Sequence, residues 1–175
     1  MGWGRKKPKV KPKAKKRGRP KVNATRVAVD GKVFNSLLES YCYTALRQAR
    51  IPATYEKRTF ELLPAFSCRN SYYCAVNGRF IERTNKVLNW SYTPDFEDDL
   101  QPELGYGFII EVKGRANERY PQVLKMFRWH NEHFLHKDIF QPSTEEEVDK
   151  MIQIIKSKIA YATETFQLKI RDHGR

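Results

Sequence analysis

Asp95, Glu111 and Lys113 form the pattern in this chain that is most typical of catalytic chemistry. Asp95 comes at the end of one predicted strand, and Glu111 and Lys113 are two residues apart in another. Side chains two residues apart on a strand share a face, whereas the neighbouring Ile110 and Val112 point the other way, toward a core. Burying such charges unpaired would be costly, so the pattern predicts one charged site.

The chemistry that needs this set is phosphodiester hydrolysis. Two carboxylates on neighbouring strands can hold Mg²⁺ through hard oxygen ligands. The ion would neutralise charge on a phosphate oxygen and help to ionise a bound water. A lysine two residues after the second acid can orient that water or stabilise the transition state electrostatically. Glu39, on a predicted helix under the sheet, could supply a third carboxylate for a second ion.

Pro94-Asp95 followed by Glu111-Val112-Lys113 resembles the signature of the PD-(D/E)XK nuclease superfamily in its Glu-x-Lys form. The wider pattern is similar to that of the phage endonuclease I family, whose members are Holliday-junction resolving enzymes. The resemblance covers about residues 33–130, and four segments carry it in the family's order: residues 34–39 (FNSLLE), Tyr55-Glu56, residues 92–96 (YTPDF) and residues 108–114 (FIIEVKG).

This resemblance implies an α/β (α+β) fold with a PD-(D/E)XK, restriction-endonuclease-like core, in which helices flank a central mixed β-sheet. It implies that Lys113 is the catalytic lysine and that Asp95, Glu111, Glu39 and the backbone carbonyl of Val112 bind metal. The implied cofactor is Mg²⁺, for which Mn²⁺ would substitute, with two ions per active site. The resemblance also implies a homodimer acting on branched DNA; whether its subunits exchange strands stays open.

The chain departs from the family pattern in two places. The segment between Tyr55-Glu56 and Tyr92-Thr93 is longer than the family's short β connection. The helix predicted from Ser143 onward has no counterpart that can be aligned. Both differences leave the dimer geometry and the choice of substrate open.

Two other functions fit the same residues. The first keeps the nuclease chemistry but acts on linear DNA, as a nicking or restriction-like endonuclease; a strong preference for four-way junctions over linear duplex would separate the two. The second is a DNA-binding accessory protein on a nuclease scaffold that no longer cuts. The intact set of Glu39, Asp95, Glu111 and Lys113 argues against this last alternative.

The positive charge of the chain is concentrated at its start. The net charge is +13, from 33 Lys and Arg against 20 Asp and Glu, and residues 1–26 hold 12 of the basic residues and no acid. A segment of this composition cannot offset the entropy of ordering. We therefore predict a flexible basic arm over residues 1–26 and a nuclease domain over residues 27–175. The charge favours a polyanionic partner, here branched or duplex DNA.

A short motif in the arm, flanked by two lysines, resembles the core of an AT-hook. Glycine would let the backbone enter a narrow A·T minor groove, proline would keep the strand extended, and the arginines would lie along the groove floor. The alternative is a plain polybasic arm. The motif is Arg17-Gly18-Arg19-Pro20, between Lys16 and Lys21.

Basic residues also follow the Glu-x-Lys strand. Lys125 and Arg128 are three residues apart on a predicted helix and share a face, and Arg115 lies closer to the strand. These side chains could bind phosphates that flank the scissile one. The alternative is a solvated helix face.

Four acids follow Asp95 closely and could be rival metal ligands. We predict instead that they lie in a solvated loop. They are Glu97, Asp98, Asp99 and Glu103.

Hydrophobic periodicity predicts the elements that would position these residues. A helix is expected over residues 34–50, with Glu39 on the flank of its apolar face. Asn77-Gly78 can supply the positive φ angles of a type I′ turn and predicts a β-hairpin. The other expected elements are strands over residues 55–63, 87–92 and 108–112, a helix over residues 120–134, and a helix from residue 143 or 144 with an apolar stripe.

The sequence predicts neither a membrane protein nor a secreted one. No apolar run is long enough to span a bilayer, and the first residues lack the apolar stretch of a secretory signal. Cys42, Cys68 and Cys74 make an odd count without the spacing of a disulfide framework. We therefore expect free thiols, no membrane partner, no small-molecule cofactor and a cytoplasmic location, either in the host of a phage or at its nucleoid.

Overall fold

The computed structural model describes residues 25–83, 85–113 and 120–173. For residues 172 and 173 it describes the backbone only. Most of the predicted basic arm therefore lies outside the described residues. So do five predicted DNA-binding residues: Lys16, Arg17, Arg19, Lys21 and Arg115.

A four-stranded mixed sheet forms the centre of the fold. β10 pairs antiparallel with β3 on one side and with β11 on the other, and β11 pairs parallel with β12. A central mixed sheet is what the resemblance implies, and this expectation is confirmed. In spatial order the strands are β12 (Asp138–Phe140), β11 (Phe108–Ile110), β10 (Phe96–Asp98) and β3 (Ala53–Tyr55).

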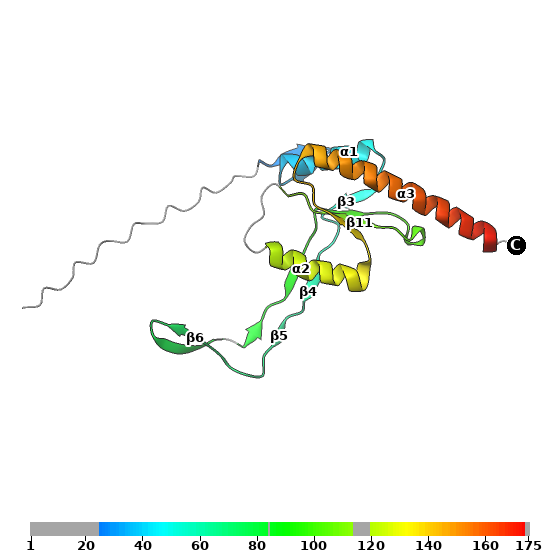
Figure 1. The fold of residues 1–175 in the computed structure, drawn as a ribbon. Helices are drawn as coiled ribbons and strands as arrows, with labels where there is room; N and C mark the ends of the chain where they lie inside the picture. Colours follow the sequence, from blue (N-terminus) through cyan, green and yellow to red (C-terminus); the bar gives the residue numbers. More distant parts are fainter. Residues whose placement is uncertain (1–24, 84, 114–119, 174–175) are drawn as a thin grey trace, which may run out of the picture.

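Helices cover both faces of this sheet, which makes the fold a mixed α+β fold. α1 (Leu37–Gln48) and α3 (Glu145–His173) lie on one face, and α2 (Tyr120–His130) lies on the other (Figure 1). Alternation along β11 explains how both faces are filled. Ile110 joins the apolar cluster under α1 and α3, while its neighbour Ile109 packs in the cluster under α2.

α1 begins with a reciprocal cap. The hydroxyl of Ser36 accepts a hydrogen bond from the amide of Glu39 at 3.1 Å and donates one to the carboxylate of Glu39 at 2.8 Å. A serine followed three residues later by glutamate is a helix-start signature. The predicted helix begins three residues too early, because Phe34 belongs to β2 (Lys32–Phe34), which pairs with β1 (Val27–Val29).

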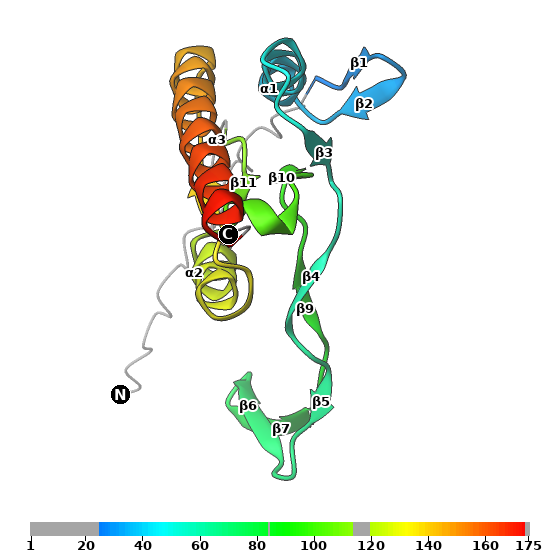
Figure 2. The ribbon, with the colours of Figure 1, turned by 90° about the vertical axis from the view of Figure 1, so that its right-hand side faces the viewer.

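Between β3 and β10 the chain forms a two-stranded ribbon that projects away from the sheet (Figure 2). Asn77 and Gly78, at φ 51° and 76°, make the predicted hairpin turn. The predicted strand over residues 55–63 is wrong in its middle: Glu56, at φ 45°, follows β3, and the ribbon begins only at Phe60. Three antiparallel pairs build the ribbon: β4 (Phe60–Leu63) with β9 (Trp90–Tyr92), β5 (Phe66–Ser67) with β8 (Lys86–Val87), and β6 (Tyr72–Val76) with β7 (Arg79–Arg83).

α3 buries its apolar stripe in its first half, where Val148, Met151 and Ile155 pack in the core as predicted. Its second half extends past the sheet (Figure 1). Across the part of the chain that the structure describes, no helix is both long and apolar enough to cross a membrane. Two short turns complete the fold, η1 (Pro102–Leu104) and the π-helical turn η2 (Asn131–Leu135) at the end of α2.

Candidate active site

Asp95 and the Glu-Val-Lys segment meet at one end of the central sheet. Asp95 lies between β9 and β10, and its Oδ2 accepts a hydrogen bond from the amide of Val112 at 2.6 Å. Glu111, Val112 and Lys113 come directly after β11, which ends at Ile110 and not at residue 112 as predicted. The amide of Glu111 donates to the carbonyl of Phe140 in β12 at 2.9 Å, so the segment is held from both sides.

Glu111 is buried, at 5% exposed, and both of its carboxylate oxygens have partners. The hydroxyl of Tyr92 donates to one oxygen, and the ammonium of Lys113 donates to the other. Lys113 also lies over the ring of Tyr120, with its nitrogen 3.7 Å from the ring centroid. Such cation–π contact stabilises a partly desolvated ammonium. Glu111 and Lys113 therefore lie on one side of the segment, as their two-residue spacing predicts.

Glu39 lies on the buried face of α1, not on its flank as predicted. Its carboxylate accepts hydrogen bonds from the hydroxyl of Tyr55 at 2.7 Å and from the amide of Asn35 at 3.0 Å, in addition to the bond from Ser36. The side chain is 7% exposed. Glu39 therefore has a structural role at the start of α1, whatever else it does.

The three carboxylates are close enough to influence one another. Burial, with the negative charges of Glu111 and Glu39, raises the pKa of Asp95 to about 8, against the opposing effects of the Val112 amide and Lys113. Burial, with the charge of Glu111, also raises the pKa of Tyr92 above its ordinary value. The mutual repulsion of these carboxylates would therefore favour a cation placed among them.

The carboxylates do not form a complete metal site as they stand. Within residues 25–83, 85–113 and 120–173, no three His, Cys, Asp or Glu side chains form a group that could hold a metal ion. Glu39 and Glu111 instead accept hydrogen bonds from protein donors. Their chemistry suits a hard cation such as Mg²⁺, and the predicted ligands Asp95, Glu111 and Val112 lie together. Occupation by two ions stays a prediction.

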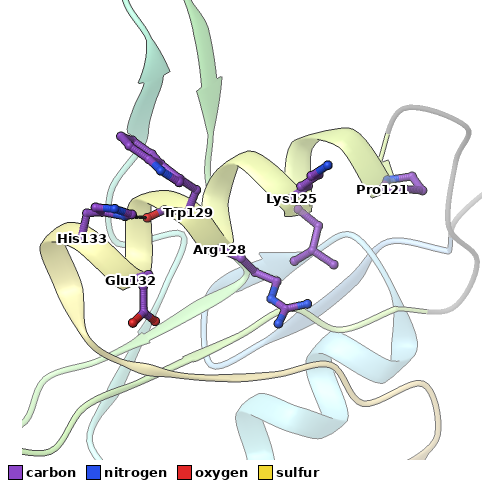
Figure 3. Close-up of a pocket in the computed structure, with 7 residues that line it drawn as sticks. Pro121, Lys125, Arg128, Trp129, Glu132 and His133 are labelled. Atoms are coloured by element: carbon purple, nitrogen blue, oxygen red, sulfur yellow. Dashed lines mark hydrogen bonds between the residues drawn. The ribbon is translucent and has the colours of Figure 1, made fainter.

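Lys125 and Arg128 lie on the exposed face of α2, as their spacing predicts. Both line a hollow of about 410 Å³. Figure 3 shows their side chains on α2. The acid Glu132 lines the same hollow, and the indole of Trp129 stacks on the ring of His133 at 4.4 Å. α2 starts at Tyr120, the residue that contacts Lys113. This basic face therefore belongs to the helix that begins at the candidate site, and its contact with DNA stays a prediction.

Sequence reasoning missed the tyrosines that hold the site. Tyr92 and Tyr55 donate to Glu111 and Glu39, and Tyr120 covers Lys113. A signal for two of them was present, because Tyr55 and Tyr92 stand inside the segments that carry the resemblance. For Tyr120, which comes after those segments, the sequence gives no comparable signal.

The prediction that Glu97 and Asp98 are solvated is wrong. Both lie in the short central strand β10, and Glu97 is 1% exposed. Arg58 and Lys137 bind Glu97 at distances of 2.5–2.9 Å, and Lys137 also binds Asp98 at 2.7 Å. Burial alone would raise the pKa of Glu97, but these cations hold it below its ordinary value. The two acids are thus structural and not rival ligands.

The fold defines an α+β protein with a charged cluster at one end of its sheet. Residues 19–144 match the model of a family described as a protein of unknown function (DUF1064), and the chain belongs to that family. The matched range contains Glu39, Asp95, Glu111 and Lys113 and stops just before α3. Neither the curated proteins nor the solved structures contain a match to the chain.

Proposed function

We propose that this protein is a metal-dependent, structure-specific DNA endonuclease that hydrolyses phosphodiester bonds in branched DNA such as Holliday junctions. One observation carries the proposal: the 2.6 Å hydrogen bond from the Val112 amide to Asp95, which brings the first acid against the Glu-Val-Lys segment. Two acids and a lysine then lie together at the ends of neighbouring strands, as hydrolysis with a metal-bound water requires. We extend the proposal to a PD-(D/E)XK core and a homodimer with two active sites.

Asp95, Glu111 and the carbonyl of Val112 would hold the metal, and Glu39 would complete the site for a second ion. When bound, Mg²⁺ supplies stabilisation of phosphate charge and a water of lowered pKa. Asp95 is half-buried and is repelled by the charges of Glu111 and Glu39, so a cation placed among the three carboxylates would relieve that repulsion. This supports the donor set on physical grounds.

Lys113 would be the second catalytic group. Its ammonium is held between Glu111 and the ring of Tyr120, which limits its freedom before substrate binds. From there it would stabilise negative charge on the phosphate or orient the attacking water. Tyr92 would act as a positioning residue, because its hydroxyl fixes one oxygen of Glu111.

A non-catalytic DNA-binding accessory protein is the second candidate. Two observations favour it: Glu39 and Glu111 accept hydrogen bonds from protein donors, and the described residues contain no complete metal-binding group. Such a protein would bind junctions or duplex without cutting them in any divalent ion.

The test is an incubation of the full chain with Mg²⁺ and three substrates: a four-way junction, a linear duplex of the same arms, and single-stranded DNA. We expect the junction to be cut fastest, with 5′-phosphate and 3′-hydroxyl ends, and EDTA to stop the reaction. Equal cutting of junction and linear duplex would identify the nicking or restriction-like alternative. Binding without cutting in Mg²⁺ or Mn²⁺ would contradict the proposal in favour of the accessory protein.

A further inference from the structure

The β6–β7 hairpin lies at the far end of the ribbon, clear of the helices (Figure 2). Tyr72, Tyr73 and Phe80 are exposed there, Phe80 to 79%. An isolated two-stranded hairpin is only marginally stable in water, and large exposed side chains on such an element indicate a binding surface. The candidate active site uses none of these residues, so the hairpin is a second candidate binding surface.

The strand register divides the hairpin into two chemically different faces. Residues directly opposite each other in an antiparallel pair point to the same side. The face that we name the arginine face has both arginines of the hairpin and no acid, and the other face has its single acid and Phe80. The arginine face holds the pairs Tyr72–Arg83, Cys74–Ile81 and Val76–Arg79, and the other face holds Tyr73–Glu82 and Ala75–Phe80.

The charge of the outer ribbon has one dominant sign. Residues 64–89 contain four basic residues and one acid, Glu82, whose carboxylate accepts a hydrogen bond from the hydroxyl of Ser71 at 2.5 Å. The Nε of Arg83 donates to the sulfur of Cys74 at 2.8 Å, a contact within the arginine face. Among the residues that the structure describes, neither Arg79 nor Arg83 forms a salt bridge. These guanidinium groups are therefore available to an anionic partner.

We propose that the arginine face of the β6–β7 hairpin binds the phosphate backbone of duplex DNA, with the ribbon lying in the major groove. A two-stranded ribbon fits a groove about 12 Å wide, and arginine is suited to phosphate oxygens. A second copy of the chain is the weaker occupant, because a symmetric pairing of two arginine faces would bring four guanidinium groups together without an acid. The inference rests on the proposed function, since it names a second contact of the same DNA.

The test removes two charges from the hairpin and compares the result with an equal loss elsewhere. The variant is Arg79→Gln with Arg83→Gln, and the matched control is Lys156→Gln with Lys169→Gln on exposed positions of α3. Binding of the full chain to a junction with long arms is measured without divalent ions over a range of salt concentrations. The logarithm of the binding constant falls linearly with the logarithm of the salt concentration, and the steepness of this line is the salt slope. Losing two phosphate contacts should lower the salt slope by about 2 and weaken binding about tenfold or more at low salt. The control should match the wild type.

A variant that keeps the charges separates their effect from that of the side-chain shape. Arg79→Lys with Arg83→Lys should restore most of the slope, because it keeps the charges. An unchanged salt dependence in the glutamine variant would overturn the inference. The inference would also be overturned if the wild type were a dimer and the glutamine substitutions made it monomeric without weakening DNA binding. Because no cleavage is involved, a protein that binds through the hairpin but never cuts would refute the proposed nuclease and leave this inference standing.

Discussion

The cations of the central sheet and those of the ribbon lie in opposite surroundings. Lys113 and Lys137 are each held against buried carboxylates, whereas Arg79 and Arg83 are exposed on a hairpin without cover. Buried charges are tolerated only where partners compensate for lost hydration, so the cations of the sheet have fixed positions. Exposed cations cost little and stay available to a polyanion. One part of the molecule therefore holds its cations in fixed positions, and another part exposes them to solvent.

The largest effect should come from the lysine of the candidate site. Lys113→Met should lower cleavage about 100- to 1000-fold, as does loss of a group that stabilises transition-state charge, while DNA binding changes only a few-fold. Single-turnover kinetics and a binding isotherm measure the two quantities separately. A matched Lys156→Met change on α3 should affect neither, and similar losses in both variants would mean that Lys113 contributes only general charge.

A cation that pairs with buried acids should matter more for stability than an exposed one. Lys137→Ala leaves Glu97 and Asp98 buried with fewer partners, so the free energy of unfolding should fall by about 3 kcal/mol. Arg79→Ala in the ribbon should change it by less than about 0.5 kcal/mol. Urea unfolding followed by circular dichroism provides both numbers, and equal effects would break the contrast between sheet and ribbon.

A divalent ion should stabilise the sheet through Asp95. At a concentration about 100 times its dissociation constant, Mg²⁺ should raise the free energy of unfolding by about 2.7 kcal/mol, and EDTA should reverse the gain. Asp95→Asn should remove the response, because it deletes a proposed ligand. Thermal unfolding with and without Mg²⁺ measures the effect; a gain that persists in the variant would place the ion elsewhere.

A smaller effect on stability than that of Lys137→Ala should come from the cap of α1. Ser36→Ala removes a hydroxyl that bonds both the amide and the carboxylate of Glu39, and should cost about 1 kcal/mol of stability. Ser157→Ala, on an exposed position of α3, is the control and should cost less. If Glu39 also serves the active site, Ser36→Ala should lower cleavage beyond what the loss of stability explains.

Local patterns were sufficient to predict several features correctly. Asn77-Gly78 needs no long-range information to form its turn, the stripe of α3 follows helical spacing, and Glu111 and Lys113 meet because they are neighbours on one side of an extended segment. In each case the residues that decide the structure are close together in the sequence.

The errors arose where distant residues decide. The sequence predicts that Glu97 and Asp98 are solvated because no cation near them in the sequence pairs with them. Their partners, Arg58 and Lys137, are about 40 residues away. The sequence predicts that Glu39 lies on the flank of the apolar helix face, because its partner Tyr55 belongs to another element and is not evident from the helix alone. Polar groups can be buried when such partners satisfy them, and a single sequence does not show which partners will meet.

Cleavage by the Glu111→Gln variant tests the central claim most directly. The wild type, Glu111→Gln and a control, Glu164→Gln at an exposed position of α3, would be compared on one four-way junction in Mg²⁺. We predict that Glu111→Gln loses at least about 99% of the cleavage rate and still binds the junction within a few-fold, while the control cuts normally. Full cleavage by Glu111→Gln, or loss of binding together with cleavage, would show that Glu111 is not a metal ligand of a nuclease.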